Sequence, residues 1–460
     1  MADFTVISEP ESADRPQQKD LDRCVHCGLC LNACPTYREL GLEMDSPRGR
    51  IYQMSQVAQG APISEDYREH IDLCLACRGC ETACPSGVKY GRLIEAARAE
   101  IESHVKRPWP ERLTRWFVFR QLLPSPAWLT VVGSALWLYQ ASGLDRLFRK
   151  FGFWNLFVSL GDLDQLMPRA EPPFFFSRIG KTFPAEGQRR YRVAFLAGCI
   201  ANVSFARLNE ATVRVLQKNG CEVVIPQGQT CCGALHVHSG LPQQARSLAR
   251  RNIEAILTGS FDAVITNAAG CGSTLKEYDE LLANDAAFAS KSRQFAALVK
   301  DVTEFLASIQ LNPIMGEVPA RVTYQDSCHL AHGQKIRHAP RQLLASIPGV
   351  VFVEMPSADL CCGSAGVYNV LHTDMAMKLL RQKMQSVSSV EPEIITTANP
   401  GCMLQLRAGT RLFGKGQRVM HVVELLDEAY NKSPQLAEHL IQGRPTSPSR
   451  RTENTAVSAK

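Results

Sequence analysis

The chain has 460 residues, enough for two or three domains, and about 45% of them are hydrophobic, so sizeable cores can form. The net charge of +6 is mild and no nucleic-acid-binding motif is present, which argues against a nucleic-acid partner. The 17 cysteines far exceed ordinary usage, while the polar start MADFTVISEPESADRPQQKD does not resemble a secretory signal. We therefore expect a cytoplasmic protein whose cysteines bind metal or carry out redox chemistry instead of forming disulfides.

Two nearly identical cysteine runs occupy the N-terminal part, RCVHCGLCLNACPTY from Arg23 and LCLACRGCETACPSG from Leu73. The spacing C-x-x-C-x-x-C-x-x-x-C-P is the ligand run of bacterial ferredoxins, in which the fourth cysteine serves the neighbouring cluster. The runs therefore predict two [4Fe-4S] clusters. Their ligands would be Cys24, Cys27, Cys30 and Cys84 for the first cluster, and Cys74, Cys77, Cys80 and Cys34 for the second. The alternative is structural zinc, which would not explain the third and fourth cysteines of each run.

The two runs lie 50 residues apart, and the insert between them is predicted to be helical. A further helix is expected from Gly91 to Val105, where apolar residues recur about every 3.6 positions. Residues 1–105 are thus predicted to form an α-helical ferredoxin-like domain with two clusters.

Residues 106–190 form a basic, tryptophan-rich segment. All five tryptophans lie in it, and Lys106 to Arg192 holds 14 Lys or Arg against 6 Asp or Glu. Leu122 to Tyr139 carries no charge over 18 residues, which is short for a membrane span. Tryptophan and arginine beside an apolar stretch favour a helix lying on anionic lipid, on the inner face of the cell membrane. The alternative is a helical linker packed on the domains or on a partner.

The C-terminal half contains a second duplication. Eight cysteines recur at offsets of 129 to 131 residues, which indicates an internal repeat. They are Cys199, Cys231, Cys232 and Cys271 in the first copy, and Cys328, Cys361, Cys362 and Cys402 in the second. Each follows a predicted strand, the place where open α/β sheets carry their sites.

These patterns divide the C-terminal half into a first module at 191–312, a second at 313–432 and a disordered tail at 433–460. Each module is expected to hold a metal or further iron–sulfur site, or the two to share one; the alternative is that these are core thiols. Five nearby histidines are read as ordinary hydrogen-bonded side chains, namely His236, His238, His329, His332 and His338. Cys221 has no counterpart and is expected to be a small buried residue.

No G-x-G-x-x-G follows a predicted strand, so the sequence offers no site for flavin or nicotinamide. Iron–sulfur clusters move single electrons, whereas oxidation of an organic substrate by two electrons needs another cofactor. We therefore expect no catalytic residue in this chain and expect the substrate chemistry to take place on another subunit.

The sequence resembles the iron–sulfur subunit of glycolate oxidase (glycolate dehydrogenase). The resemblance rests on both cysteine runs, the DSPRGRIYQM stretch, FLAGC, TCCG, DSCHLAHGQ, LCCGSAG and TANPGCMLQ. It implies a ferredoxin-type 4Fe-4S domain followed by tandem cysteine-rich (CCG) domains. It also implies an oxidoreductase complex acting on CH–OH donors, in which a flavin-bearing partner oxidises glycolate to glyoxylate and electrons pass towards membrane quinone.

Related pieces occur in heterodisulfide reductase subunits and in the third subunit of anaerobic glycerol-3-phosphate dehydrogenase, which leaves an iron–sulfur subunit of either type as the alternative. In the first of these relatives the last cysteine of each module begins a C-x-x-C. Here Gly-Ser-Thr follows Cys271 and Met-Leu-Gln follows Cys402, so each module offers four thiols.

Overall fold

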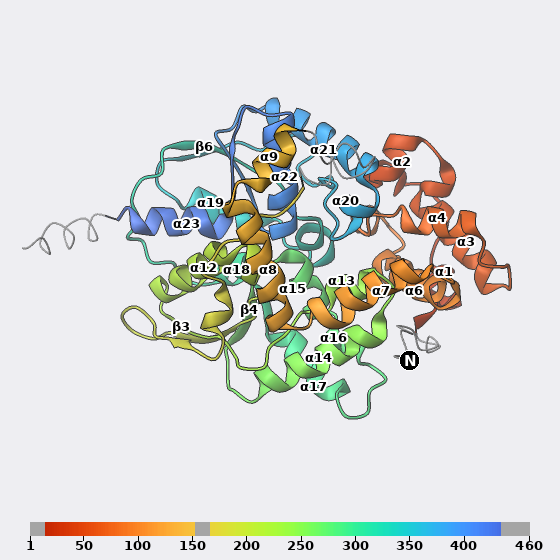
Figure 1. The fold of residues 1–460 in the computed structure, drawn as a ribbon, viewed down its shortest axis with the longest axis horizontal. Helices are drawn as coiled ribbons and strands as arrows, with labels where there is room; N and C mark the ends of the chain where they lie inside the picture. Colours follow the sequence, from red (N-terminus) through yellow and green to blue (C-terminus); the bar gives the residue numbers. More distant parts are fainter. Residues whose placement is uncertain (1–13, 152–165, 434–460) are drawn as a thin grey trace, which may run out of the picture.

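The computed structural model describes residues 14–151 and 166–433. A helical domain made by the N-terminal part lies at one end, and helices α8 and α9 cross the front of two α/β modules (Figure 1). The predicted disordered tail at 433–460 falls, apart from Ser433, outside the described residues.

The N-terminal domain is helical, as predicted, and no strand occurs in residues 14–105. Ser46 starts α3 by accepting a hydrogen bond from the Gly49 N–H at 3.0 Å, and Ser64 does the same for α4. Leu93 and Ile94 of α6 are buried in the domain core. The elements are α1 (Gln18–Leu21), η2 (Leu31–Ala33), α2 (Pro35–Leu40), η3 (Glu43–Asp45), α3 (Pro47–Ala58), α4 (Glu65–Asp72), α5 (Gly79–Thr82) and α6 (Tyr90–His104).

The basic segment forms a bent set of helices. These are α7 (Trp109–Trp116), the π-helical turn η4 (Phe117–Leu122), α8 (Pro126–Ala141) and α9 (Leu144–Lys150). The uncharged stretch predicted at 122–139 is therefore broken, because α8 begins only at Pro126, which takes the first helical position. Among the described residues no single helix is long and apolar enough to cross a membrane, although Trp109–Leu122 and Pro126–Ala141, bent by 112°, pass that test together.

Both C-terminal modules are built on parallel sheets, as their alternating strands and helices predict. The first sheet has the order β1-β3-β2-β4-β5 and the second β7-β6-β8-β9. The strands are β1 (Thr182–Phe183), β2 (Tyr191–Phe195), β3 (Cys221–Val224), β4 (Ala263–Thr266), β5 (Val299–Asp301), β6 (Ala320–Tyr324), β7 (Val350–Phe352), β8 (Ile394–Thr397) and β9 (Arg418–His421).

Equivalent strands have equivalent registers. Val193 pairs with Val223 and Ala263, and Val322 pairs with Phe352 and Ile394. The first sheet has one addition, because β1 pairs antiparallel with β3. The end of the segment predicted to be a linker therefore contributes an edge strand to the first module.

Helices cover the sheets, and one hydrophobic core runs through both modules. This core joins Val193 and Phe195 of the first sheet to Val322 and Tyr324 of the second. The helices of the first module are α11 (Ala201–Ser204), α12 (Ala206–Lys218), α13 (Ala234–His238), α14 (Pro242–Leu257), α15 (Ala269–Lys276), α16 (Tyr278–Leu281), α17 (Ala289–Leu298) and α18 (Val302–Ser308). Those of the second are η7 (His329–Gly333), α19 (His338–Ala345), α20 (Tyr368–Leu371), α21 (Thr373–Ser388), α22 (Pro400–Leu412) and α23 (Val422–Asn431).

Candidate metal centres

The thiols of the second run gather around one small cavity with a thiol of the first. Cys34, Cys74, Cys77 and Cys80 all line this cavity, whose volume is about 20 Å³. Burial, followed by the neighbouring thiols Cys77, Cys74 and Cys34, raises the pKa of Cys80 well above its usual value. The structure thus places the fourth cysteine of the first run with the first three of the second, the grouping that the motif predicts.

The remaining four thiols lie closer to the surface. Cys24, Cys30 and Cys84 pack at the edge of the domain core, and Cys27 is exposed. Burial raises the pKa of Cys30 to about 11, with a smaller contribution from Cys24. Cys24 lies near Cys30, and Cys84 packs against the same core cluster as both of them.

Both runs hold the same unusual backbone conformation. His26 and Gly28 in the first run, and Ala76 and Arg78 in the second, all have positive φ angles, of 53°, 83°, 50° and 63°. A left-handed conformation costs a non-glycine residue about 1 kcal/mol or more. Strain at matching positions on either side of the second cysteine indicates that both loops are shaped to wrap a ligand.

Arg50 is a site residue that sequence reasoning missed. It is fully buried and donates to His70 O and Asp45 O, both at 2.6 Å, and to Thr36 Oγ1 at 3.1 Å. Thr36 Oγ1 in turn lies 3.2 Å from Cys34 Sγ, and Arg50 lines the same cavity as the thiols. The available signal was the DSPRGR stretch, where Ser-Pro starts a helix and an arginine follows on its inner face.

Tyr90 is a second residue of this kind. Its hydroxyl lies 3.7 Å from Cys74 Sγ, and it also lines the cavity. A hydrogen bond to a cluster sulfur is one way in which a protein adjusts a reduction potential.

Each C-terminal module brings its four predicted thiols together. In the first module Cys232 Sγ lies 3.1 Å from Cys271 Sγ, and hydrogen bonds link Cys199 to Cys231 and Cys231 to Cys232. The contact with Cys231, followed by burial, raises the pKa of Cys199.

The second module repeats this chain of contacts. Its hydrogen bonds link Cys328 to Cys361, Cys361 to Cys362 and Cys362 to Cys402. Cys221, which was expected to be a buried small residue, is indeed fully buried at the start of β3. Each cysteine pair begins several residues after its strand has ended, since β3 ends at Val224 and β7 at Phe352.

The glycine after each cysteine pair is required by the backbone. Gly233 and Gly363 have φ angles of 84° and 90°, and their N–H groups each donate to a thiol, Cys231 and Cys361, at 3.5 Å. A Cβ on Gly363 would lie 2.5 Å from Ala376 O. Only glycine tolerates both the conformation and this close approach.

The histidines near the thiols have other partners, as expected. The ring nitrogens of His236, His329 and His332 lie 2.8 to 3.0 Å from backbone oxygens, and His238 Nδ1 lies 2.9 Å from Glu95 Oε1. Burial lowers the pKa of His238 and of His329 to about 3. His338 begins α19.

The thiol set of the second module lies beside the second cysteine run. Cys77 packs in one apolar cluster with Cys328 and Cys361, so the second-module set adjoins the second run. The Tyr368 hydroxyl also donates to Leu73 O at 3.1 Å across this junction.

The thiol set of the first module lies near the second module and the linker helices. The loop that carries Cys271 meets the loop that carries Cys402, because Ala269 N donates to Ala398 O at 3.3 Å. In the second of these loops, Asn399 Nδ2 lies 3.5 Å from Cys402 Sγ. Cys199 and Cys231 pack with residues of η4 and α8, including Leu129. The ferredoxin-like domain contacts the first module too, since Arg98 donates to His238 O at 3.0 Å, and the first-module set adjoins the linker helices.

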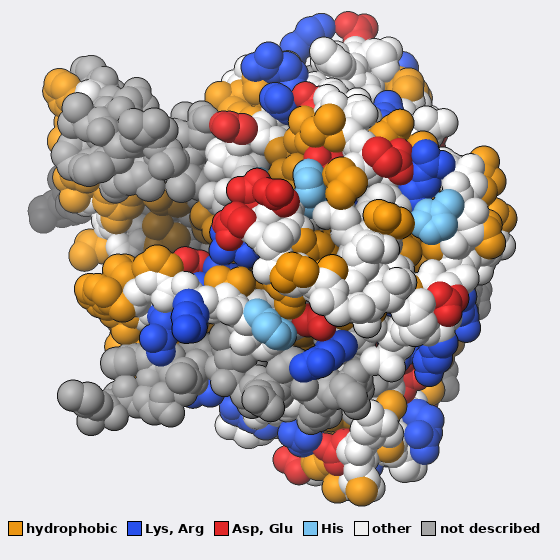
Figure 2. All heavy atoms as spheres, turned by 90° about the vertical axis from the view of Figure 1, so that its right-hand side faces the viewer, with side chains coloured by type: hydrophobic (Ala, Val, Ile, Leu, Met, Phe, Trp, Pro, Cys, Tyr) orange, Lys and Arg blue, Asp and Glu red, His pale blue; other side chains and the backbone are white. Residues whose placement is uncertain are grey.

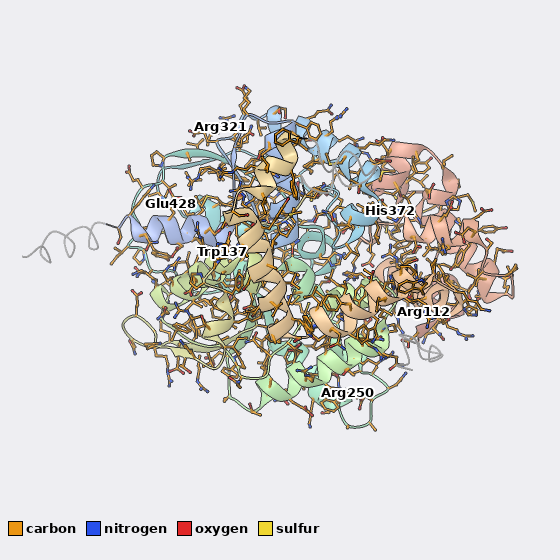
Figure 3. All side chains as sticks on the ribbon, in the orientation of Figure 1. Arg112, Trp137, Arg250, Arg321, His372 and Glu428 are labelled. Atoms are coloured by element: carbon orange, nitrogen blue, oxygen red, sulfur yellow. The ribbon has the colours of Figure 1, made fainter. Side chains whose placement is uncertain are left out.

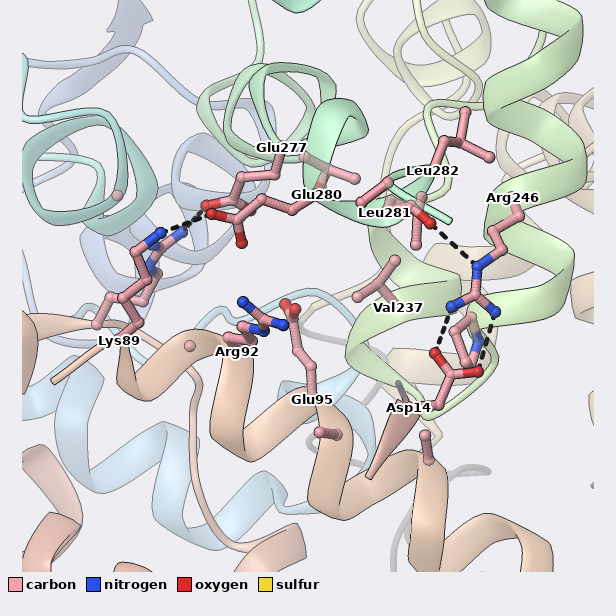
Figure 4. Close-up of a pocket in the computed structure, with 18 of the residues that line it drawn as sticks. Asp14, Lys89, Arg92, Glu95, Val237, Arg246, Glu277, Glu280, Leu281 and Leu282 are labelled. Atoms are coloured by element: carbon pink, nitrogen blue, oxygen red, sulfur yellow. Dashed lines mark hydrogen bonds and ion pairs between the residues drawn. The ribbon is translucent and has the colours of Figure 1, made fainter. Parts of the chain in front are cut away.

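A separate cavity of about 600 Å³ lies between α6 and the first module (Figure 4). Glu95 and Glu277 face it, and burial raises the pKa of both carboxyls, partly offset by Arg78, which bonds to Glu277. Arg246 closes one end by binding Asp14 through two hydrogen bonds, drawn in Figure 4.

The donor atoms fit iron–sulfur clusters. Ligating thiols must be deprotonated, and burial here disfavours a bare thiolate, so a bound cationic centre would offset that penalty. Within residues 14–151 and 166–433, no group of three or more His, Cys, Asp or Glu side chains is arranged to hold a single metal ion. Two ferredoxin-type thiol runs and a pair of four-thiol α/β modules together define an iron–sulfur protein with several candidate centres.

Comparisons with known proteins identify the family. Family models match residues 20–88 (4Fe-4S dicluster domain), 110–167 (glycolate oxidase iron-sulfur subunit, linker region), and 193–276 and 322–407 (cysteine-rich domain). The chain is 42% identical to a probable glycolate oxidase iron-sulfur subunit of Bacillus subtilis (strain 168), over 91% of this chain and 96% of that protein. It is 36% identical to the glycolate oxidase iron-sulfur subunit of Escherichia coli (strain K12), over 90% and 95%. Lactate utilization protein A of Oceanobacillus iheyensis is 30% identical over 51% of this chain and 96% of that protein.

The chain belongs to the family of glycolate oxidase iron–sulfur subunits. The resemblance predicted from the sequence is thereby confirmed, as are the 4Fe-4S domain and the repeated cysteine-rich domain. The protein is an iron–sulfur component of an oxidoreductase.

Proposed function

We propose that this chain is the electron-transfer subunit of a glycolate (2-hydroxy acid) dehydrogenase complex. A flavoprotein partner oxidises glycolate to glyoxylate, and this chain carries the electrons towards membrane quinone. The observation that carries the proposal is the packing of Cys77 in one apolar cluster with Cys328 and Cys361, because it brings the ferredoxin-type thiols next to the thiols of the second module.

Eight thiols hold two [4Fe-4S] clusters in this proposal. Cys24, Cys27, Cys30 and Cys84 ligate one, and Cys74, Cys77, Cys80 and Cys34 ligate the other. Each module thiol set holds a further metal or iron–sulfur centre. When bound, such clusters supply one-electron chemistry.

Charged, hydrogen-bonding and apolar side chains surround the second thiol set. Arg50 places a buried positive charge beside the second set, which favours the more negative, reduced state of a bound cluster. The Ala76 N–H donates to Cys74 Sγ at 3.4 Å, and the Tyr90 hydroxyl approaches the same sulfur. The apolar surroundings, such as Leu75 and Leu379, exclude water from the junction with the second module.

The linker helices dock the complex on the inner face of the cell membrane. Helix α8 buries Leu129 and Gly133 against the protein and exposes Trp128, Val131 and Trp137. Figure 3 labels Trp137 on this helix and Arg112 on α7, and Figure 2 displays apolar side chains along the edge where these helices lie. Burial of tryptophan and leucine at the headgroup boundary is favourable.

Basic side chains strengthen this docking. Arg112, Arg120 and Arg146 are exposed along the linker helices, whereas Glu111 is paired with Arg107. Each arginine near anionic lipid contributes about 1 kcal/mol, and salt screens this contribution.

The membrane part of the proposal is tested by extraction. High salt should release only part of the protein from membranes, and detergent should release the rest. Trp128→Ser with Trp137→Ser should make it extractable by salt alone, with the clusters intact by electron paramagnetic resonance. If these variants stay bound, the linker is a packing element.

The catalytic part is tested with the purified chain and its complex. The flavin-free chain should not oxidise glycolate with any dye, whereas the complex should, and glycolate should reduce its iron–sulfur signals. Turnover by the flavin-free chain would contradict the proposed division of labour.

A further inference from the structure

The first thiol run lies under an exposed apolar patch. Val25 and Leu29, on either side of the exposed Cys27, are 67% and 61% exposed. Leu42 and Met44 are likewise exposed on a neighbouring loop. Large apolar side chains grouped on a surface usually mark an interaction site.

Arg48 ties the two loops into one surface. It donates to His26 O at 3.1 Å and to Glu43 Oε1 at 2.7 Å. A Cβ on Gly28 would lie 2.7 Å from Arg48 Nη1, so the arginine packs directly on the thiol loop. Tyr52, one turn further along α3, extends the patch with a half-exposed ring.

The charges around this patch differ from those of the linker. Asp22 and Glu43 are exposed beside Arg23 and Arg48, so acidic and basic groups balance. An anionic lipid surface would be attracted by an excess of basic groups, as on the linker helices. The balanced rim favours a protein.

The exposed thiol of the first run points to the kind of protein that docks here. Cys27 is exposed, whereas Cys74 and Cys80 of the second run are buried. The first run is therefore the place where a ferredoxin-domain site reaches the surface, and it lies in a different part of the chain from the linker helices, which pack against the first-module thiols.

We propose that the run-1 patch, formed by Val25, Leu29, Leu42, Met44 and Tyr52, is the docking surface for the flavin-bearing subunit that donates electrons to this chain. This assignment rests on the proposed function and adds the place where the partner binds. Interfaces of electron-transfer pairs are small, often below about 1,200 Å² in total, which suits two short loops and one helix turn. Cys27, which lies between Val25 and Leu29 in the chain, would be covered by apolar contacts that exclude water on docking.

The test compares matched double variants of the full chain, each co-expressed with the flavoprotein subunit. Val25→Asp with Leu29→Asp places two charges in the patch. Val351→Asp with Leu371→Asp does the same at residues that are 57% and 67% exposed in the second module. The measured quantities are flavin bound per purified chain and reduction of the iron–sulfur signals by glycolate.

The patch variant should lose bound flavin at least tenfold, and the control variant should keep it. Both should keep dithionite-reducible cluster signals, which separates lost docking from a lost cluster. Retention of flavin by the patch variant would overturn the inference and leave the proposed function standing. Absence of flavin from the wild-type complex would instead overturn the proposed function.

Two further outcomes would assign the patch to another occupant. If the patch variant loses binding to vesicles of phosphatidylcholine and phosphatidylglycerol, the patch faces lipid. If it converts a wild-type dimer to a monomer, the patch joins two copies of this chain. Either result would contradict the inference.

Discussion

Replacement of Arg50 by methionine tests whether the buried polar network supports the second cluster site. Methionine retains much of the apolar volume but removes the guanidinium. His70 O and Thr36 Oγ1 then lose the Arg50 donor, Asp45 O keeps only the Thr36 hydroxyl at 2.8 Å among its described oxygen and nitrogen donors, and the Asp45 carboxylate loses the Arg50 Nη2 group at 3.2 Å.

The expected cost follows from these partners. Loss of one member of a buried ion pair typically costs about 3–5 kcal/mol, because the other charge stays buried. Asp45 keeps His70 Nδ1 at 2.9 Å, so the lower end applies, about 3 kcal/mol. At about 1.4 kcal/mol per factor of ten, local opening of α3 should become roughly 100-fold more frequent.

Hydrogen exchange measured by mass spectrometry on the cluster-loaded chain detects this opening in peptides that cover α3. Arg48→Met is the matched control, two residues away on the same helix. Its partner Glu43 is 47% exposed, and an exposed pair contributes about 0–1 kcal/mol. The control should therefore change the exchange rate less than about tenfold.

The network also affects the thiols. Thr36 loses its hydrogen bond from Arg50 while lying 3.2 Å from Cys34, so the resonance signal of the second cluster should change. Its midpoint potential should fall, because a nearby positive charge no longer favours the reduced state. If Arg50→Met leaves the hydrogen exchange of the α3 amides as slow as in the wild type, the buried network does not support this site. The same conclusion holds if Arg48→Met speeds that exchange as much as Arg50→Met does.

Three other substitutions test the arrangement of the sites. Cys34→Ser should perturb the cluster of the second run in paramagnetic resonance; a change confined to the first cluster would contradict the shared ligation. Cys361→Ser should alter the signal of the second-run cluster, whereas the equivalent change Cys231→Ser should leave it unchanged, because Cys361 shares an apolar cluster with Cys77 and Cys231 packs in another one. Gly133→Leu should loosen α8 by about 1–3 kcal/mol, since even a Cβ there would lie 2.6 Å from a Val203 methyl; unchanged hydrogen exchange in α8 would show that the helix does not depend on this contact.

Much of the local structure follows from the sequence. The insert between the runs reads as helical, and it forms α3 and α4, each started by a serine cap. The repeat of four cysteines at a nearly constant offset anticipates two modules with equivalent strand orders. These features depend on spacing, capping and periodicity, which act over a few residues or repeat along the chain.

The linker is harder to predict. Its uncharged stretch at 122–139 does not predict the 112° bend between Trp109–Leu122 and Pro126–Ala141, and the last part of the linker joins the first sheet as β1. A hydropathy pattern reports composition, whereas the bend and the edge strand depend on which surfaces of the first module accept them.

The sequence by itself determined that this is an iron–sulfur protein, because cluster ligands must be thiols at fixed short spacings within a loop. Only the tertiary structure decided what surrounds those thiols: Arg50 linked to Cys34 through Thr36, Cys77 packed in a cluster with Cys361, and Cys199 packed near α8. Such contacts join residues far apart in the chain, and which ones form is settled when complementary surfaces pack into a shared core.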